Sequence, residues 1–214
     1  WDESSSEAVN KLRIQAQAGD ISWDLVDVVA ADAIRLCDEG LAELIDHDSA
    51  LAAAPDGTPA TADFGELIVS ECFIPQIVYS ITWGVRNDVA EWNGAMPDSV
   101  CDVFDTEAFP GKRAILPNAL NNMEWGAYCS MGDDRDVSKV YAMLETEEGQ
   151  QTALDMWSTI KDDLIFAASA ADVPQLLQDG EVVMGSTYNG RLFSLIAESG
   201  VENVEMLWDA QVLD

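Results

Sequence analysis

The sequence is poor in basic residues. Only 10 lysines and arginines stand against 40 aspartates and glutamates in 214 residues, which gives a formal net charge of −30. Such a chain would repel the phosphates of a nucleic acid, so we expect no nucleic-acid partner. The acids are scattered along the whole chain, which is typical of a solvated acidic surface. A cationic partner or an adaptation to salty surroundings would also fit.

Long hydrophobic runs and catalytic motifs are also absent. No segment reaches the roughly 18 apolar residues of a membrane helix. The sequence contains no P-loop, GxGxxG, GxSxG or HExxH motif. The single histidine, His47, lies between two aspartates, where we expect an exposed loop and no catalytic triad. No CxxC pair accompanies it, so we expect neither a metal site nor a cofactor.

Four cysteines are present, an even number that suggests two disulfides formed in an oxidising compartment. We pair neighbours along the chain, Cys37–Cys72 and Cys101–Cys129. Each pair would close a loop of about 30 residues and stabilise the fold by roughly 3–4 kcal/mol. Four buried free thiols remain the alternative. The chain begins at Trp1 and not at Met, so we expect a processed protein or a fragment.

Strand-like apolar runs alternate with helical patterns, which predicts an α/β fold with parallel sheets. We expect strands at residues 21–29, 164–166, 181–184 and 204–208, and another after the turn at 109–111. A helix starting at Asp172 and ending at Gly180, the strand 181–184 and a glycine-rich loop at 185–190 follow one another. Ligands bind at such strand ends in open α/β sheets, although an ordinary crossover is the alternative.

Residues 71–85 are rich in β-branched and aromatic side chains and too long for one ordinary strand. We interpret this segment as a connection between two domains. Clefts between domains often hold ligands, so Tyr79, Ser80 and Trp83 are candidate contacts, with plain core packing as the alternative.

Aromatic residues and acids lie close together near the predicted strand ends. Aromatic faces and carboxylates together suit an organic ammonium group. Packing of the aromatics in the core is again the alternative. The aromatics are Trp23, Tyr79, Trp83, Trp125, Tyr188 and Trp208, and the acids are Asp24, Asp27, Glu124 and Asp209.

An ordered set of motifs carries a family resemblance over essentially the whole chain: SWDLVDV, FDTEAFPGKRAI, NNMEW, TIKDDLIF and QLLQDGEVVMGSTYNGR. They resemble the polyamine-type (spermidine/putrescine) periplasmic substrate-binding proteins of ABC transporters, which have the type II periplasmic-binding-protein fold. The resemblance implies two α/β lobes, each a mainly parallel sheet flanked by helices. A ligand cleft would lie between them and close on a hinge.

The resemblance also implies a division of the chain. Residues 1–78 would be part of lobe one, 79–86 a crossing strand at the hinge, 87–207 lobe two, and 208–214 the start of a return crossing. Further chain would precede residue 1 and follow residue 214. We expect a periplasmic monomer, without its secretion signal here, that delivers a small amine-bearing ligand to an ABC permease in the membrane.

Five site residues follow from the resemblance. Glu124 matches the acidic ligand contact on a lobe-two helix, and Tyr188 takes the place of the aromatic residue that stacks on the ligand's methylenes. Asp27 or a neighbour would sit at a strand end of the first lobe. Tyr79 and Trp83 would lie at the hinge, and Asp209, after the last predicted strand, completes the acidic candidates.

Arg191 departs from the family pattern, because several diamine binders have an acid or a small residue there. A guanidinium facing the cleft would repel a second ammonium and could bind a carboxylate bidentately. A polyamine and an ω-amino acid such as 4-aminobutyrate are therefore nearly level as ligands. Alternatively, Arg191 points to solvent or pairs with an acid such as Glu198.

An acid–base hydrolase on an α/β scaffold is the alternative from another functional class. It would use two cleft carboxylates, one of them with a pKa raised by burial. The sequence contains no nucleophile motif, so we expect a binding protein and not an enzyme.

Overall fold

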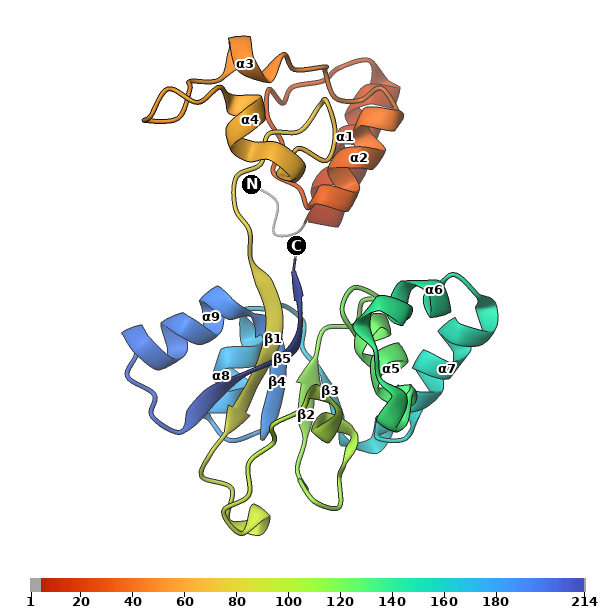
Figure 1. Cartoon of the computed structure of the whole chain (residues 1–214), viewed down its shortest axis with the longest axis vertical. Helices are drawn as coiled ribbons and strands as arrows, with labels where there is room; N and C mark the ends of the chain where they lie inside the picture. Colours follow the sequence, from red (N-terminus) through yellow and green to blue (C-terminus); the bar gives the residue numbers. More distant parts are fainter. Residues whose placement is uncertain (1–4, 214) are drawn as a thin grey trace. The chain divides into compact units, whose positions relative to one another are not determined.

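The computed structural model describes residues 5–213, which form two compact units (Figure 1). The first unit runs to Val78, and the second from Tyr79 to Leu213. Within residues 5–213, no helix has both the length and the apolar character that a membrane span requires.

The first unit consists of helices and irregular segments. Helix α1 (Ser5–Ala18) packs against α2 (Ala30–Asp38) through Val9, Leu12 and Leu36. The Cys37–Cys72 disulfide joins the end of α2 to the segment that leads toward the unit boundary. The remaining elements are short: α3 (His47–Ala50), α4 (Ala60–Phe64) and the 3-10 turn η1 (Gly65–Leu67).

The strand predicted at residues 21–29 is wrong, because this segment is irregular. A strand needs a neighbouring backbone for its hydrogen bonds, and no strand occurs among the described residues of this unit. Trp23, Val26 and Val28 instead cover the core between α1 and α2. Asp27 is exposed in the irregular segment and does not lie at a strand end.

The prediction of an exposed His47 is also wrong. Its side chain is buried, and its Nε2–H donates a hydrogen bond to the Phe73 carbonyl oxygen at 2.7 Å. The histidine therefore serves the packing of the first unit.

The second unit is built on a five-stranded sheet with the order β3-β2-β4-β1-β5 (Figure 1). β2 is parallel to β3 and β4, whereas β1 is antiparallel to β4 and β5. The α/β architecture is confirmed, but the sheet is mixed and not mainly parallel. The prediction of parallel strands was wrong for β1, because the alternation of strands and helices in a sequence does not indicate the direction of each strand in the sheet. The strands are β1 (Ser80–Arg86), β2 (Arg113–Ile115), β3 (Leu164–Phe166), β4 (Met184–Tyr188) and β5 (Val204–Leu213).

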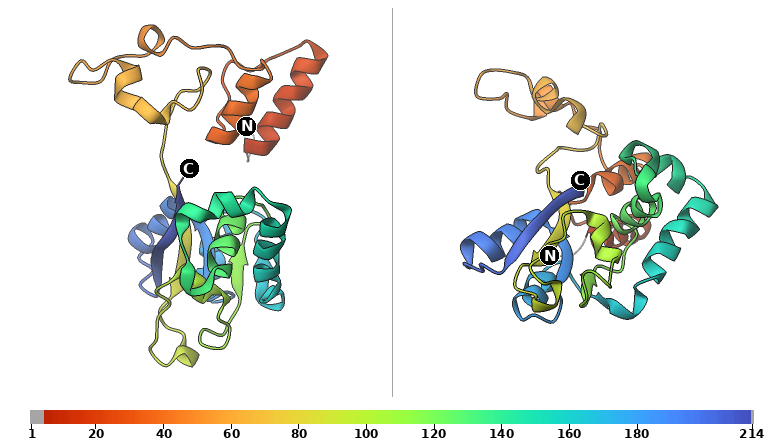
Figure 2. Two further views of the ribbon diagram at one scale, coloured as in Figure 1. Left: turned by 45° about the vertical axis from the view of Figure 1, so that its right-hand side comes forward. Right: turned by 60° about the horizontal axis from the view of Figure 1, so that its bottom comes forward.

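Helices cover both faces of this sheet (Figure 1, Figure 2). On one face, α5 (Asn122–Ser130) and α7 (Glu147–Ser158) enclose an aromatic core with Trp83, Trp125 and Trp157. On the other face, α8 (Asp172–Gln178) and α9 (Asn189–Phe193) pack over the sheet. The remaining helical turns are η2 (Ala90–Trp92), η3 (Val100–Phe104), η4 (Gly132–Asp134), η5 (Val137–Lys139), α6 (Val140–Leu144), η6 (Lys161–Asp163) and the π-helical η7 (Ser194–Glu198).

The predicted strand 181–184 and loop 185–190 are displaced in the structure. β4 begins at Met184, and the small residues after it continue the strand, while Asn189 opens α9. A Cβ on Gly185 would lie 2.6 Å from Val173 Cγ1, so the glycine permits the close approach of α8. The glycine therefore serves the packing of a helix on the sheet. In the sequence, small residues in a strand look like the composition of a loop.

The last strand is longer than predicted. β5 runs to Leu213 and belongs to the second unit, as does β1. The second disulfide, Cys101–Cys129, links η3 to α5. Both disulfides therefore join the cysteines that were paired in the sequence analysis.

Gly126 lies where α5 packs closely on α7, so a substitution at this position tests that packing. A Cβ there would lie 2.5 Å from the Ala153 carbonyl oxygen. We expect Gly126→Ala to destabilise the protein by about 1–3 kcal/mol, despite the better helix propensity of alanine. Denaturant unfolding measures this free energy.

Gly190→Ala is the matched control, because no atom lies within 4 Å of the added Cβ in α9. It should leave stability unchanged or raise it by up to about 1 kcal/mol. Equal stabilisation by both substitutions would contradict the packing account.

Candidate functional site

One edge of the second unit's sheet gathers several strand ends. The pairs Ile81–Tyr188 and Ser80–Leu213 place the start of β1 beside the ends of β4 and β5. β2 runs parallel to β4, so it ends at the same edge. We call this set of strand ends the carboxyl edge. Ligands bind at such an edge in open α/β sheets.

Two tyrosines meet at the carboxyl edge. The rings of Tyr79 and Tyr188 are 5.1 Å apart between centroids and inclined by 78°. Both pack against the aromatic core on the α5 side of the sheet. The Ser80 backbone N–H donates to Asn189 Oδ1 at 3.0 Å, which ties the start of β1 to the end of β4.

Glu124 lies in the first turn of α5, the helix that follows β2. Its Oε2 atom is buried, and no described residue hydrogen-bonds to it. Burial raises the pKa of Glu124, although the backbone N–H groups of Asn121 and Glu124 favour the ionised form. Burial, and then the charge of Glu124, raise the pKa of Tyr141. A buried carboxylate oxygen without a donor is suited to an incoming ammonium group.

Asn121 is a candidate that the sequence analysis missed. Its side chain is buried, and its Oδ1 has no hydrogen-bond partner among the described residues. The backbone has φ = 61°, a positive value that is uncommon for residues other than glycine. The NNMEW motif contains this residue, and its place before an acidic helix start was the available signal. Asn121 adds a second acceptor one turn before Glu124.

Trp83 was expected as a ligand contact and is instead a core residue. It is 1% exposed, and its ring lies 5.4 Å from Trp125 and 6.4 Å from Trp157 between centroids. β1 is flanked by β4 and β5, so its side chains on this face are covered by α5 and α7. Trp83 supports α5 from the sheet.

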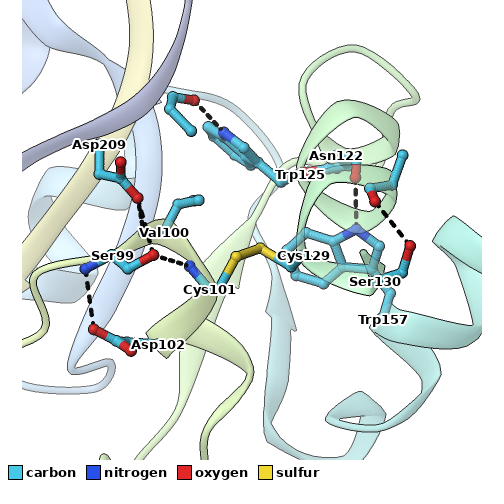
Figure 3. The surroundings of a disulfide bond; sticks show 12 residues. Ser99, Val100, Cys101, Asp102, Asn122, Trp125, Cys129, Ser130, Trp157 and Asp209 are labelled. Atoms are coloured by element: carbon cyan, nitrogen blue, oxygen red, sulfur yellow. Dashed lines mark hydrogen bonds between the residues drawn. A yellow bond between two sulfur atoms is a disulfide. The ribbon is translucent and has the colours of Figure 1, made fainter. Parts of the chain in front are cut away.

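Asp209 is engaged within the protein. Its Oδ2 atom accepts hydrogen bonds from Ser99 Oγ at 2.9 Å and the Val100 backbone N–H at 2.8 Å (Figure 3). These donors belong to the start of η3. The carboxylate thus caps a helical turn.

Arg191 is exposed on α9, with its Cζ atom 5.9 Å from the centroid of the Tyr188 ring. Within residues 5–213 it forms no ion pair, with Glu198 or with any other acid. It also borders a groove of about 440 Å³ along α8 and α9 that contains neither Glu124 nor Tyr188. The groove is lined by Ala171, Pro174, Gln175, Gln178, Gly190, Arg191, Ser194, Leu195 and Ser199.

Of the residues expected at the site, Tyr188 contacts Tyr79 and also lies beside Arg191 at the carboxyl edge. Glu124 lies in α5, the helix that follows the end of β2. Asp27 belongs to the first unit, whereas this edge is built from the second unit alone. The edge thus offers a carboxylate, aromatic faces and a guanidinium.

The chain belongs to the bacterial extracellular solute-binding protein family. The sequence profile of that family matches residues 2–214. The family consists of binding proteins and not enzymes, which removes the hydrolase alternative.

Three similar proteins illustrate the relationship. The gamma-aminobutyric acid-binding protein of Pseudomonas aeruginosa is 29% identical over 95% of this chain and 53% of its own length. The structure of the Atu4243 GABA receptor has a TM-score of 0.76 at 28% identity, over 95% of this chain and 57% of that one. The binding protein MotA from Agrobacterium tumefaciens B6, solved with glucopine, has a TM-score of 0.76 at 27% identity, over 95% and 58%.

These similarities confirm the periplasmic-binding-protein fold and the broad family. They do not confirm the polyamine-type assignment. The chain spans about half the length of the relatives that it matches.

The buried carboxylate of Glu124 generates a pH-dependent prediction. Because its folded-state pKa is raised, its stabilising contribution is present below the ordinary carboxyl pKa and is lost as the pH rises through the raised value. Without ligand, Glu124→Gln should be more stable than the wild type near neutral pH, by about 1 kcal/mol. The gap should close below about pH 4.

Denaturant unfolding at a series of pH values measures this gap. Glu202→Gln removes the same charge at an exposed position and serves as the control. A stability difference for Glu124→Gln that stays constant with pH would refute the assignment of a buried, unpaired carboxylate.

Proposed function

We propose that this protein captures a small ω-amino acid, such as 4-aminobutyrate, at the carboxyl edge. The observation that carries the proposal is that two opposite charges of the second unit have no ionic partner in residues 5–213: Arg191, which lies beside Tyr188, and Glu124, in the first turn of α5. Glu124 presents a buried oxygen without a donor, and Arg191 presents a guanidinium without an acid, within the described residues.

The ammonium end of the ligand would bind Glu124. A charge-assisted hydrogen bond would satisfy Oε2 and replace the hydration that burial removes. Asn121 Oδ1, also without a partner among residues 5–213, would accept a second hydrogen bond from the ammonium group. Tyr79 and Tyr188 would offer ring surface to the methylenes and to the cation.

The carboxylate end would bind Arg191. The planar guanidinium is matched to a carboxylate, and its position against the Tyr188 ring brings it to the same edge. A diamine would place a second ammonium near this cation and lose affinity. The geometry therefore favours an ω-amino acid over putrescine or spermidine, which form the second candidate class.

The similar proteins support the same choice. Two of them are named for gamma-aminobutyric acid, at 29% and 28% identity. In keeping with the family, we infer a periplasmic monomer that hands its ligand to an ABC permease. The cleft between two lobes, which the sequence analysis expected, stays a prediction.

Calorimetry on the full-length protein tests the proposal with 4-aminobutyrate, putrescine and spermidine. We expect 4-aminobutyrate to bind most tightly. Arg191→Gln should weaken it roughly tenfold or more, because a charge-assisted pair is lost, while putrescine should bind as well as before or better.

Arg135→Gln is the matched control, since it removes an exposed guanidinium elsewhere in the second unit. It should leave both affinities within about twofold. Tighter binding of putrescine than of 4-aminobutyrate, with no effect of Arg191→Gln, would establish the polyamine reading. No binding of any of the three ligands would refute the proposed function.

A further inference from the structure

Strand β5 departs from regular pairing at residues 208–211. Positions 81 and 83 of β1 pair with positions 212 and 207 of β5, so β5 carries three residues more than the pairing needs. Ala210 has φ = 47° within this bulge. Leu207, Ala210 and Val212 consequently all pack against the aromatic core, which simple alternation would forbid. Bulges of this kind redirect groups near functional sites.

Two adjacent residues of the bulge hold two different helical elements. Asp209 Oδ2 accepts hydrogen bonds from Ser99 Oγ and the Val100 backbone N–H at the start of η3. The Ala210 carbonyl oxygen accepts a hydrogen bond from Trp125 Nε1 of α5 at 2.8 Å. Figure 3 shows Asp209 with Ser99 and Val100, and nearby Trp125 and the Cys101–Cys129 disulfide.

The Cys101–Cys129 disulfide closes these contacts into a ring. Cys101 lies in η3 and Cys129 in α5, so the path runs from β5 to η3, through the sulfur bridge to α5, and back to β5. η3 is also held at its other end, because Arg113 Nε–H donates to the Val103 carbonyl oxygen at 2.9 Å. The turn is therefore a fixed link in the ring.

The ring fixes the part of α5 that carries the site. Trp125 and Cys129, its two attachment points, are one helical turn apart. Glu124 directly precedes Trp125 in the same helix. A rotation of α5 that displaced the Glu124 carboxylate would have to break one of these links.

We propose that Asp209 is a positioning residue for the ligand site. It does not touch the ligand; it holds η3, and through the disulfide α5, so that the Glu124 carboxylate meets the ligand's ammonium group. This inference rests on the proposed function for its effect on affinity, but the restraint on α5 is independent of the ligand.

Asp209→Ala in the full-length protein tests this role. At a temperature where the variant is folded, calorimetry should show about tenfold weaker binding of 4-aminobutyrate, as expected when a supporting contact is lost. Hydrogen exchange of the α5 amides, without ligand, should accelerate. Asp209→Asn retains an oxygen acceptor and should restore most of the affinity.

Asp88→Ala is the matched control. Asp88 accepts a hydrogen bond from Asn203 Nδ2 and pairs with Arg86 at the opposite end of β1. Its loss should lower the melting temperature and leave both the affinity and the exchange of α5 unchanged. If Asp209→Ala fails to fold, Ser99→Ala removes one of the two hydrogen bonds to Asp209 and the Ser99 cap on the Cys101 backbone N–H, and it should give the same direction of change in affinity and in α5 exchange.

A lower melting temperature with unchanged affinity and unchanged α5 exchange in Asp209→Ala would overturn the inference, as would failure of Asp209→Asn to differ from the alanine variant. If the wild type binds none of the amines, the proposed function fails separately. The exchange of α5 then decides the inference: acceleration supports the restraint, and no change overturns it.

Discussion

The packing of Trp125 on Trp83 is the contact on which the candidate site depends. It fixes α5 over the sheet face at a ring distance of 5.4 Å, with Trp157 stacked behind Trp83. Consecutive residues of an α-helix point about 100° apart. Because Trp125 is directed into the core, Glu124 is held at the border of that core. The carboxylate is thus buried enough to lose hydration and still lies next to the carboxyl edge.

Because the chain has many acids and few basic residues, a basic side chain without an acidic partner is informative. Of the 10 basic residues, Arg13, Arg35, Arg86, Lys112 and Lys139 form ion pairs with acids in the part of the chain that the structure describes. In the second unit, Arg86 and Lys112 pair with aspartates, and buried Arg113 donates to the backbone carbonyls of Val103, Asp105, Phe109 and Gly111. Burial lowers the pKa of Arg113, whose charge the carbonyl dipoles stabilise. Arg191 has no ion pair among the described residues and lies beside the Tyr188 ring, so its charge is available to a ligand at the carboxyl edge.

The sequence was sufficient for the fold class, for the pairing of neighbouring cysteines and for the helix that starts at Asp172, because composition, order along the chain and capping residues are local signals. It was insufficient where long-range pairing decides. Residues 21–29 have the apolar run of a strand, but no described backbone in the first unit pairs with them. Residues 185–187 have the small side chains of a loop, but they lie in β4, where Gly185 permits the close approach of α8. The direction of β1 leaves no local trace at all.

The difference between local signals and long-range contacts also applies to the candidate site residues. An aromatic residue and a neighbouring acid look alike in a sequence whether they bind a ligand or brace a core. Trp83 and Asp209 match that pattern as well as Tyr188 and Glu124 do. In the structure, complete burial separates Trp83 from Tyr188, and hydrogen bonding separates Asp209 from Glu124. Asp209 already has two donors, whereas one oxygen of Glu124 has none among the residues described. Since an unsatisfied buried acceptor costs free energy, it is retained where binding compensates for it. We therefore propose the acid with internal partners, Asp209, as a support of the site and the acid without them, Glu124, as a ligand contact.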